Sequence, residues 1–76
     1  MDCYEFRYTL TLMSAGPDRL RTMAALRSVR PDLTLTQAKA MIATLPVVVL
    51  TDIWRNDRDG LERRFRGIAD VEMSVA

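Results

Sequence analysis

Apolar and polar residues alternate almost without error near the start of the chain. Between residues 4 and 13, apolar side chains fall on every second position, and threonine or a charged residue stands between them. The apolar positions are Tyr4, Phe6, Tyr8, Leu10 and Leu12. A period of two predicts a β-strand with one buried side and one wet side, which is typical of an antiparallel sheet.

A helix is predicted directly after this strand. Gly16 breaks the alternation, and Pro17 suits the first helical position. Asp18 is favourable at the positive end of a helix dipole. Pro31 disfavours helical geometry at the residue before it, so we place this helix at residues 17–29.

A second helix is predicted from the stretch "LTLTQAKAMIATLP". Thr34 and Gln37 have the spacing of a capping box at its start, and Pro46 marks its end. Apolar residues recur at helical spacing between them, at Ala38, Met41, Ile42 and Leu45. The lysine Lys39 stands near the start of this helix in a chain whose other basic residues are all arginine.

The rest of the chain adds a strand, a helix and a strand. The β-branched run at 47–51 predicts the second strand, and the alternation at 70–75 predicts the third. Between them, residues 55–67 predict a helix that is capped by Asn56 or Asp57 and has Leu61, Phe65 and Ile68 as its core stripe. The predicted fold class is α+β: a two-layer sandwich in the order β-α-α-β-α-β, with three helices on one face of a three-stranded antiparallel sheet.

The predicted core combines one side of the first strand with one side of each helix. Its members are Tyr4, Phe6, Tyr8, Leu10, Leu12, Ala25, Leu26, Val29, Ile42, Leu61 and Phe65. A chain of 76 residues forms one domain, and a domain of this size has a thin margin of stability. We therefore expect these apolar positions to be needed for folding.

Composition narrows the function more by what is missing than by what is present. The chain contains no histidine and a single cysteine, Cys3, so the usual general base and the common zinc ligands are absent. No serine or cysteine stands in a nucleophile motif, and the three glycines are too far apart for a phosphate loop. We expect a protein that is not an enzyme, with no catalytic residues, no metal site and no cofactor.

Charge and hydropathy also restrict the partners. The net charge of +1 is too small to favour nucleic acid or an anionic membrane as a partner. The longest apolar run is far shorter than a membrane span, and the start of the chain lacks the pattern of a secretion signal. The expected location is therefore the cytoplasm.

The first helix has apolar residues on two sides. At 100° per residue, one side gathers Thr22, Ala25, Leu26 and Val29, and nearly the opposite side gathers Leu20, Met23, Ala24 and Arg27. Either the second helix covers the latter side, or it is an exposed apolar patch rimmed by Arg19, Arg27 and Lys39. Periodicity alone does not choose between these alternatives.

The same helices resemble a known family. The stretch "RLRTMAALRSVRPDLTLTQAKAMIATLP" is similar to the first two helices of the C-terminal domain of the bacterial ribosomal stalk protein L7/L12, which read approximately KVxVIKxVRxxTGLGLKEAKxLVxxxP. The resemblance extends to "FRYTLTLMSAG", "NDRDGLERRF" and "ADVEMSV", and so covers essentially the whole chain. Ala24 replaces a lysine of the family pattern, and Asp32 and Thr34 replace two glycines.

The resemblance implies a fold of the order given above and a role in protein binding. In the stalk family, an apolar and basic face on the first two helices docks onto translational GTPases. Carried over to this chain, the partner-binding residues are Arg19, Leu20, Met23, Arg27 and Lys39. The expected partner is a translational GTPase or another host protein.

The resemblance also sets the domain prediction. We expect residues 1–76 to form a single domain of this kind that lacks the family's N-terminal dimerisation segment and hinge. Such a domain would act as a free-standing competitor or inhibitor, as in a phage or mobile element, or as a module reused for an unrelated partner.

Two alternatives stay open from the sequence. The arginines between Arg55 and Arg66 are a candidate nucleic-acid surface, although acidic residues are interleaved with them. The β-α-α-β-α-β order is also shared with the ClpS protease adaptors. Those need an Asn-Asp pair after the first strand, where this chain has "MSAGPD".

Overall fold

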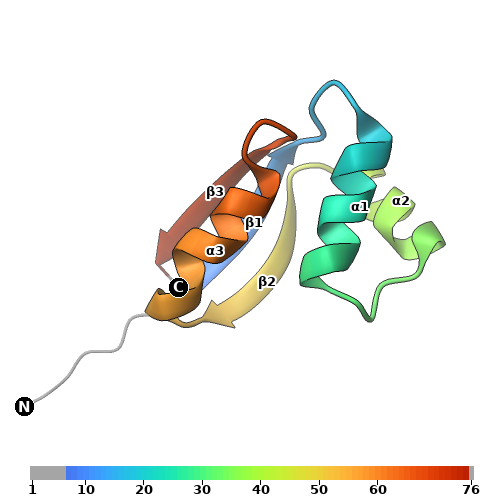
Figure 1. The fold of residues 1–76 in the computed structure, drawn as a ribbon. Coiled ribbons are helices and arrows are strands. Elements are labelled where there is room, and N and C mark those ends of the chain that lie inside the picture. The colour runs from blue at the N-terminus through green and yellow to red at the C-terminus, as the bar shows by residue number, and fades with distance from the viewer. Residues whose placement is uncertain (1–6, 76) are drawn as a thin grey trace, which may run out of the picture.

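The computed structural model describes residues 7–75, which form a three-stranded sheet and three helices (Figure 1). In chain order the elements are β1 (Tyr8–Ser14), α1 (Arg19–Val29), α2 (Leu35–Ala43), β2 (Val47–Ile53), α3 (Arg55–Phe65) and β3 (Asp70–Val75). The strands lie in the order β2-β1-β3 and all pairs are antiparallel. The predicted α+β fold and its β-α-α-β-α-β order are confirmed. Figure 1 shows α3 lying across the sheet, while α1 and α2 lie side by side at one end of it.

The alternation in β1 produces the predicted two-sided strand. Leu10 and Leu12 are completely buried, and Tyr8 on the same side is half-buried. Leu10 faces Leu50 of β2 and Met73 of β3 across the sheet, so apolar side chains meet on one side. The predicted residues Tyr4 and Phe6 lie outside the described part of the chain.

Helix α3 covers this side of the sheet, and α1 and α2 close the core at one end of it (Figure 1). Among the predicted core residues that the structure describes, six are buried: Leu10, Leu12, Ala25, Leu26, Ile42 and Phe65. The other three, Tyr8, Val29 and Leu61, are half-buried and pack against that cluster. The core prediction is therefore confirmed for the described residues, with these three at its margin.

Strand β2 departs from regular pairing at two points. Leu10 pairs with Leu50 while Thr11 pairs with Val48, so one residue of β2, Val49, is extra. Val49 is buried, and its carbonyl oxygen accepts a hydrogen bond from Arg30 Nη1 at 3.3 Å. Val47 and Val49 lie on one side of β2, as alternation along the strand requires, and the bulge sets the next residue, Leu50, opposite Leu10 as well.

The second irregularity lies between the pairs Leu10–Leu50 and Tyr8–Ile53, in the part of β2 that continues beyond its predicted end. The strand was predicted to end at Thr51, but pairing continues to Ile53, which is buried opposite Tyr8. Asp52 between them has a φ of 55°, a left-handed conformation that aspartate tolerates better than most residues. Because the polar residue Asp52 interrupts the apolar run, the sequence did not indicate that Ile53 belongs to the strand.

The turns at one end of the molecule pack closely. Gly16, with a φ of +72°, lies so near the α3–β3 turn that a Cβ on it would be 2.0 Å from the carbonyl oxygen of Ile68. The buried hydroxyl of Thr22 donates to the carbonyl oxygens of Ala15 and Asp18. These contacts fix the position of the first turn of α1 relative to both β1 and β3.

The start predicted for α2 is confirmed, whereas α1 begins at Arg19 and not at Pro17 as predicted. Asp18 caps α1, its Oδ1 accepting from the backbone N–H groups of Leu20 and Arg21 at 3.1 and 3.3 Å. Thr34 and Gln37 form the predicted capping box of α2, with bonds of 2.8 and 3.1 Å. Pro46 follows α2, and the peptide bond before it is cis.

The predicted cap of α3 is wrong. The helix begins at Arg55, so Asn56 and Asp57 lie inside its first turn, and the capping residue is Trp54, whose side chain makes no capping hydrogen bond. The cause is the extension of β2 to Ile53, which leaves a single residue between strand and helix. None of the helices within residues 7–75 is long and apolar enough to cross a membrane.

Candidate functional site

The exposed side of α1 carries one large apolar residue. Leu20 is 76% exposed, and Ala24 and Arg27 continue the same line toward the end of the helix. Positions i, i+4 and i+7 lie on one face, and this line is about 10 Å long. On the side of α1 whose covering the sequence left open, Leu20 is therefore exposed.

Met23 does not belong to that patch. It is only 7% exposed and lies in the same buried cluster as Ala38 and Ile42 of α2. Its position is about 60° around α1 from Leu20, and α2 packs beside α1 (Figure 1). The expectation that Met23 is partly exposed is wrong, because α2 covers one half of the second apolar side and leaves the other half open.

Arg27, the last residue of the line Leu20, Ala24 and Arg27 on α1, also contacts the loop before α2. Its Nε donates a hydrogen bond of 3.3 Å to the carbonyl oxygen of Leu33, which is buried two residues before α2 begins. Leu35, the first residue of α2, is 56% exposed, and Lys39 follows one turn later on the same exposed face. Leu20, Arg27, Leu35 and Lys39 are called the α1–α2 surface below.

Leu35 is not among the partner-binding residues predicted from the sequence, and Arg19, which is among them, lies on another side of α1 from Leu20. Leu35 falls at N1 of a helix whose capping box was recognised, so its outward direction could have been found from the same wheel that buries Ala38 and Ile42. Arg19 is exposed at the first position of α1, about 100° around the helix from Leu20. Arg27 thus shares a face of α1 with Leu20 at a distance of about 10 Å along the helix, and Arg19 lies beside Leu20 on another side of the helix.

The loop between α1 and α2 is held by an ion pair. Arg30 Nη2 lies 2.8 Å from Asp32 Oδ2, and the hydrogen bond from Arg30 holds the pKa of the Asp32 carboxyl below its usual value. Arg30 also bonds to Val49 of β2, as described above. The loop that leads into the α1–α2 surface is therefore tied to the sheet.

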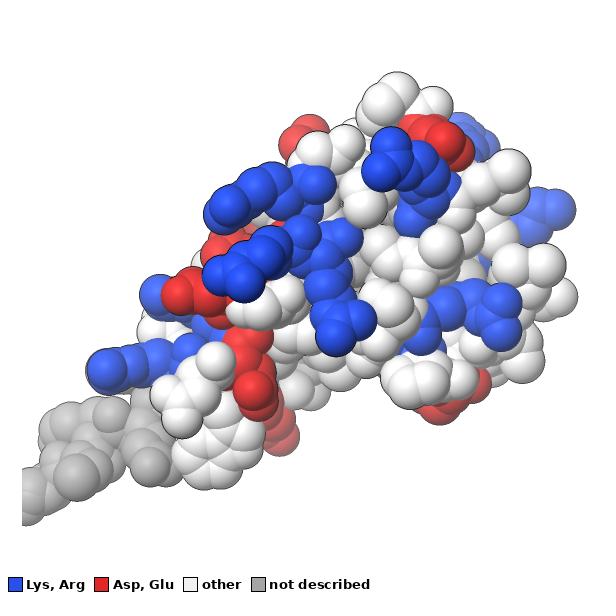
Figure 2. Space-filling view, viewed as in Figure 1, with Lys and Arg blue, Asp and Glu red and all other residues white. Residues whose placement is uncertain are grey.

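The arginines of α3 form a mixed surface. Figure 2 shows Lys and Arg side chains gathered over α3, with acidic side chains among them. Arg58 is already engaged: its guanidinium lies 5.0 Å from the ring centre of Tyr8, donates to the Tyr8 hydroxyl at 3.3 Å and pairs with Asp59 at 3.5 Å. The nucleic-acid alternative gains no site of concentrated positive charge from this arrangement.

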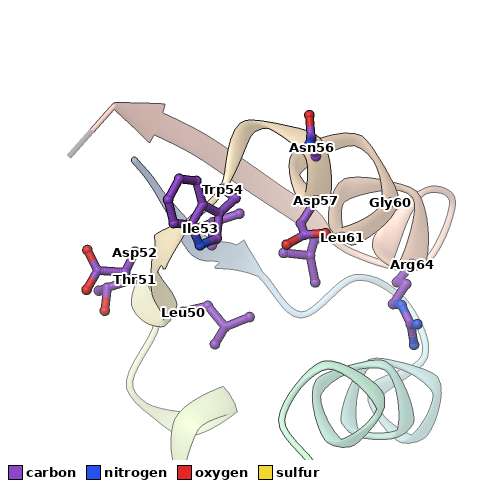
Figure 3. Close-up of a pocket in the computed structure, with 10 residues that line it drawn as sticks. All are labelled: Leu50, Thr51, Asp52, Ile53, Trp54, Asn56, Asp57, Gly60, Leu61 and Arg64. Atoms are coloured by element: carbon purple, nitrogen blue, oxygen red, sulfur yellow. The ribbon is translucent and has the colours of Figure 1, made fainter. Parts of the chain in front are cut away.

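A cleft of about 470 Å³ lies between β2 and α3 (Figure 3). Leu50, Ile53, Trp54 and Leu61 supply its apolar lining, and Thr51, Asp52, Asn56, Asp57, Gly60 and Arg64 supply the rest. Trp54 is 47% exposed, and the Arg7 guanidinium carbon lies 3.3 Å from the centre of its ring. The residues 7–75 hold no cluster of three or more histidine, cysteine or acidic side chains that could bind a metal ion.

Gly60 in the wall of this cleft should reduce the stability of α3. It lies in the interior of the helix, and a Cβ placed on it would meet no atom within 4 Å. We expect Gly60→Ala to raise the free energy of unfolding by about 0.5–1 kcal/mol, the usual preference of a helix for alanine. Urea unfolding followed by circular dichroism measures this, and a loss of stability would show that the backbone at Gly60 is not ordinary helix.

The comparison with known proteins supports the resemblance that the helix sequences indicate. The chain resembles the C-terminal domain of the bacterial ribosomal stalk protein L7/L12, as its helix sequences indicate. It is 29% identical over 66 residues to the large ribosomal subunit protein bL12 of Acidobacterium capsulatum, an alignment that covers 87% of this chain and 52% of that protein. The chain thus spans about half the length of the relative it matches. No protein-family model matches the chain.

Proposed function

We propose that this domain is a stalk-like protein-binding module that docks a translational GTPase through the α1–α2 surface. The observation that carries the proposal is Leu20, an aliphatic side chain left 76% exposed in a small domain that needs its apolar residues for the core. Arg27 lies on the same line of α1 about 10 Å further along, so an apolar and a basic group share one face of the helix. Similarity to a large-subunit ribosomal protein supports the choice of partner class.

The two kinds of side chain have different roles in this proposal. Leu20 and Leu35 supply apolar area that a partner removes from water, which is worth about 1.5–3 kcal/mol for a fully buried leucine. Arg27 and Lys39 supply positive charge around them, which accelerates encounter with an acidic patch and fixes orientation. An apolar centre with a charged rim is the usual anatomy of a protein interface.

Leu20→Asp should weaken binding of purified translational GTPases by about tenfold or more, since about 1.4 kcal/mol of lost contact is a factor of ten. Isothermal titration calorimetry measures this affinity. The matched control is Val75→Asp, which places the same charge on another exposed apolar residue, at the end of β3. Equal losses for both variants, or no binding of any translational GTPase by the unmodified chain, would contradict the proposal.

Lys39→Glu separates the charge contribution from the apolar one. We expect it to lower the association rate and to reduce the dependence of that rate on salt, because rim charges act mainly on encounter. Stopped-flow fluorescence measures the rate. An unchanged association rate at low salt would show that Lys39 takes no part in binding.

The competitor role predicted from the sequence stays a prediction.

A further inference from the structure

One side of α3 carries a line of residues that the α1–α2 surface does not use. Asp57, Gly60, Leu61 and Arg64 follow the spacing i, i+3, i+4, i+7 and all line the cleft beside β2 (Figure 3). These four residues are called the α3 stripe. Leu61 is half-buried, and the other three are exposed. Within residues 7–75, neither the Asp57 carboxylate nor the Arg64 guanidinium has an ion-pair partner.

Gly60 leaves the middle of the α3 stripe without a side chain. Glycine is unfavourable inside a helix, and the packing of this chain does not require it, because a Cβ at Gly60 would meet no atom within 4 Å. What the missing side chain allows is the approach of another backbone to α3. The surroundings of Gly60 favour a ligand with apolar surface, since Leu50, Trp54 and Leu61 line the same cleft.

The charges of the stripe are self-complementary. Asp57 and Arg64 are seven residues apart, and the midpoint between them falls between Gly60 and Leu61. A second α3 laid antiparallel over that midpoint would place its Arg64 opposite Asp57 and its Asp57 opposite Arg64. This is the arrangement that a two-fold axis requires, in which one patch binds a copy of itself. Antiparallel helices also set opposite ends of their dipoles together.

We propose that two copies of this chain associate through the α3 stripe, as an antiparallel pair of α3 helices with the two-fold axis at Gly60 and Leu61. Gly60 lets the helices approach, Leu61 and Trp54 lose exposed apolar area, and the two Asp57–Arg64 pairs fix the register. A helix pair with a bordering cleft is a small interface, so the dimer is a weak one that forms in the micromolar to millimolar range. None of the residues of the α1–α2 surface takes part, so a dimer presents two such surfaces.

Sedimentation equilibrium over a range of concentrations of the unmodified chain tests this proposal. Asp57→Arg and Arg64→Asp each bring like charges together, and each should raise the dimer dissociation constant by about tenfold or more. The double variant that carries both changes restores opposite charges across the axis, and we expect it to regain the original constant within about threefold. Arg63→Asp is the matched control, since it makes the same charge change on the same helix outside the stripe.

Three outcomes would overturn the proposal. The chain could stay monomeric at millimolar concentration, the single variants could dimerise as well as the unmodified chain, or the double variant could stay as weak as either single one. Circular dichroism shows that each variant is folded, so that loss of the dimer is not loss of the domain. A dimer broken by Leu20→Asp and unaffected by the α3 variants would assign self-association to the α1–α2 surface instead.

Discussion

Replacing Gly16 by alanine is expected to lower the free energy of unfolding by about 3 kcal/mol or more. A left-handed backbone costs an alanine about 1–2 kcal/mol, and here the new Cβ would also stand 2.0 Å from the carbonyl oxygen of Ile68. That oxygen belongs to backbone and cannot rotate away, so the contact between the β1–α1 and α3–β3 turns must open. Urea unfolding followed by circular dichroism measures the loss.

Gly67 provides the matched control for this change. Its φ of +76° is almost the same, but a Cβ on it would meet no atom within 4 Å. Gly67→Ala should therefore cost only the backbone term of about 1–2 kcal/mol. If both variants lost the same stability, the close approach of Gly16 to Ile68 would have no energetic importance.

Met23→Asp is expected to unfold most of the protein at room temperature. The side chain is buried between α1 and the α2 residues of the core, so the change removes apolar packing and places a carboxylate there without a partner. Removing a buried methionine costs about 2–5 kcal/mol, and an unpaired buried charge adds to this. A small domain has about 5–15 kcal/mol in total, so the loss is a large share.

Leu20→Asp, which places the same charge one turn away on α1, compares an exposed position with the buried position of Met23. Leu20→Asp changes an exposed residue of the same helix, and its unfolding free energy should stay within about 0.5 kcal/mol of the unmodified chain. Thermal unfolding of the two variants side by side gives the comparison. A well-folded Met23→Asp variant would mean that α2 leaves the whole second apolar side of α1 open.

Local signals account for most of the fold that the sequence predicted. The alternation of β1, the capping box at Thr34 and Gln37 and the helix break near Pro31 each depend on neighbours in sequence, and the structure has all of them where expected. The core residues followed from the same periodicities, because burial of a helix face or a strand side is a local pattern once the class of fold is known.

What the sequence did not predict depends on contacts between distant segments. Leu20 and Met23 occur on the same apolar side of α1, and only the position of α2 decides that one is exposed and the other buried. The position of Leu50 opposite Leu10 depends on how β2 pairs with β1, a register that the β2 sequence does not contain by itself. Of the predicted partner-binding residues Met23 is thus buried, and Leu35, which was not predicted, is exposed.

The irregular pairing of β2 affects how copies of this protein can meet. β2 is an outer strand of the sheet, and a regular outer strand offers free N–H and C=O groups to which the strand of another molecule can bond. Here the extra residue Val49 bends the strand, its carbonyl is already occupied by Arg30, and Asp52 turns the backbone into a left-handed conformation. Sheet extension along this edge is therefore blocked, and the sheet is protected on this side from growing into fibrils.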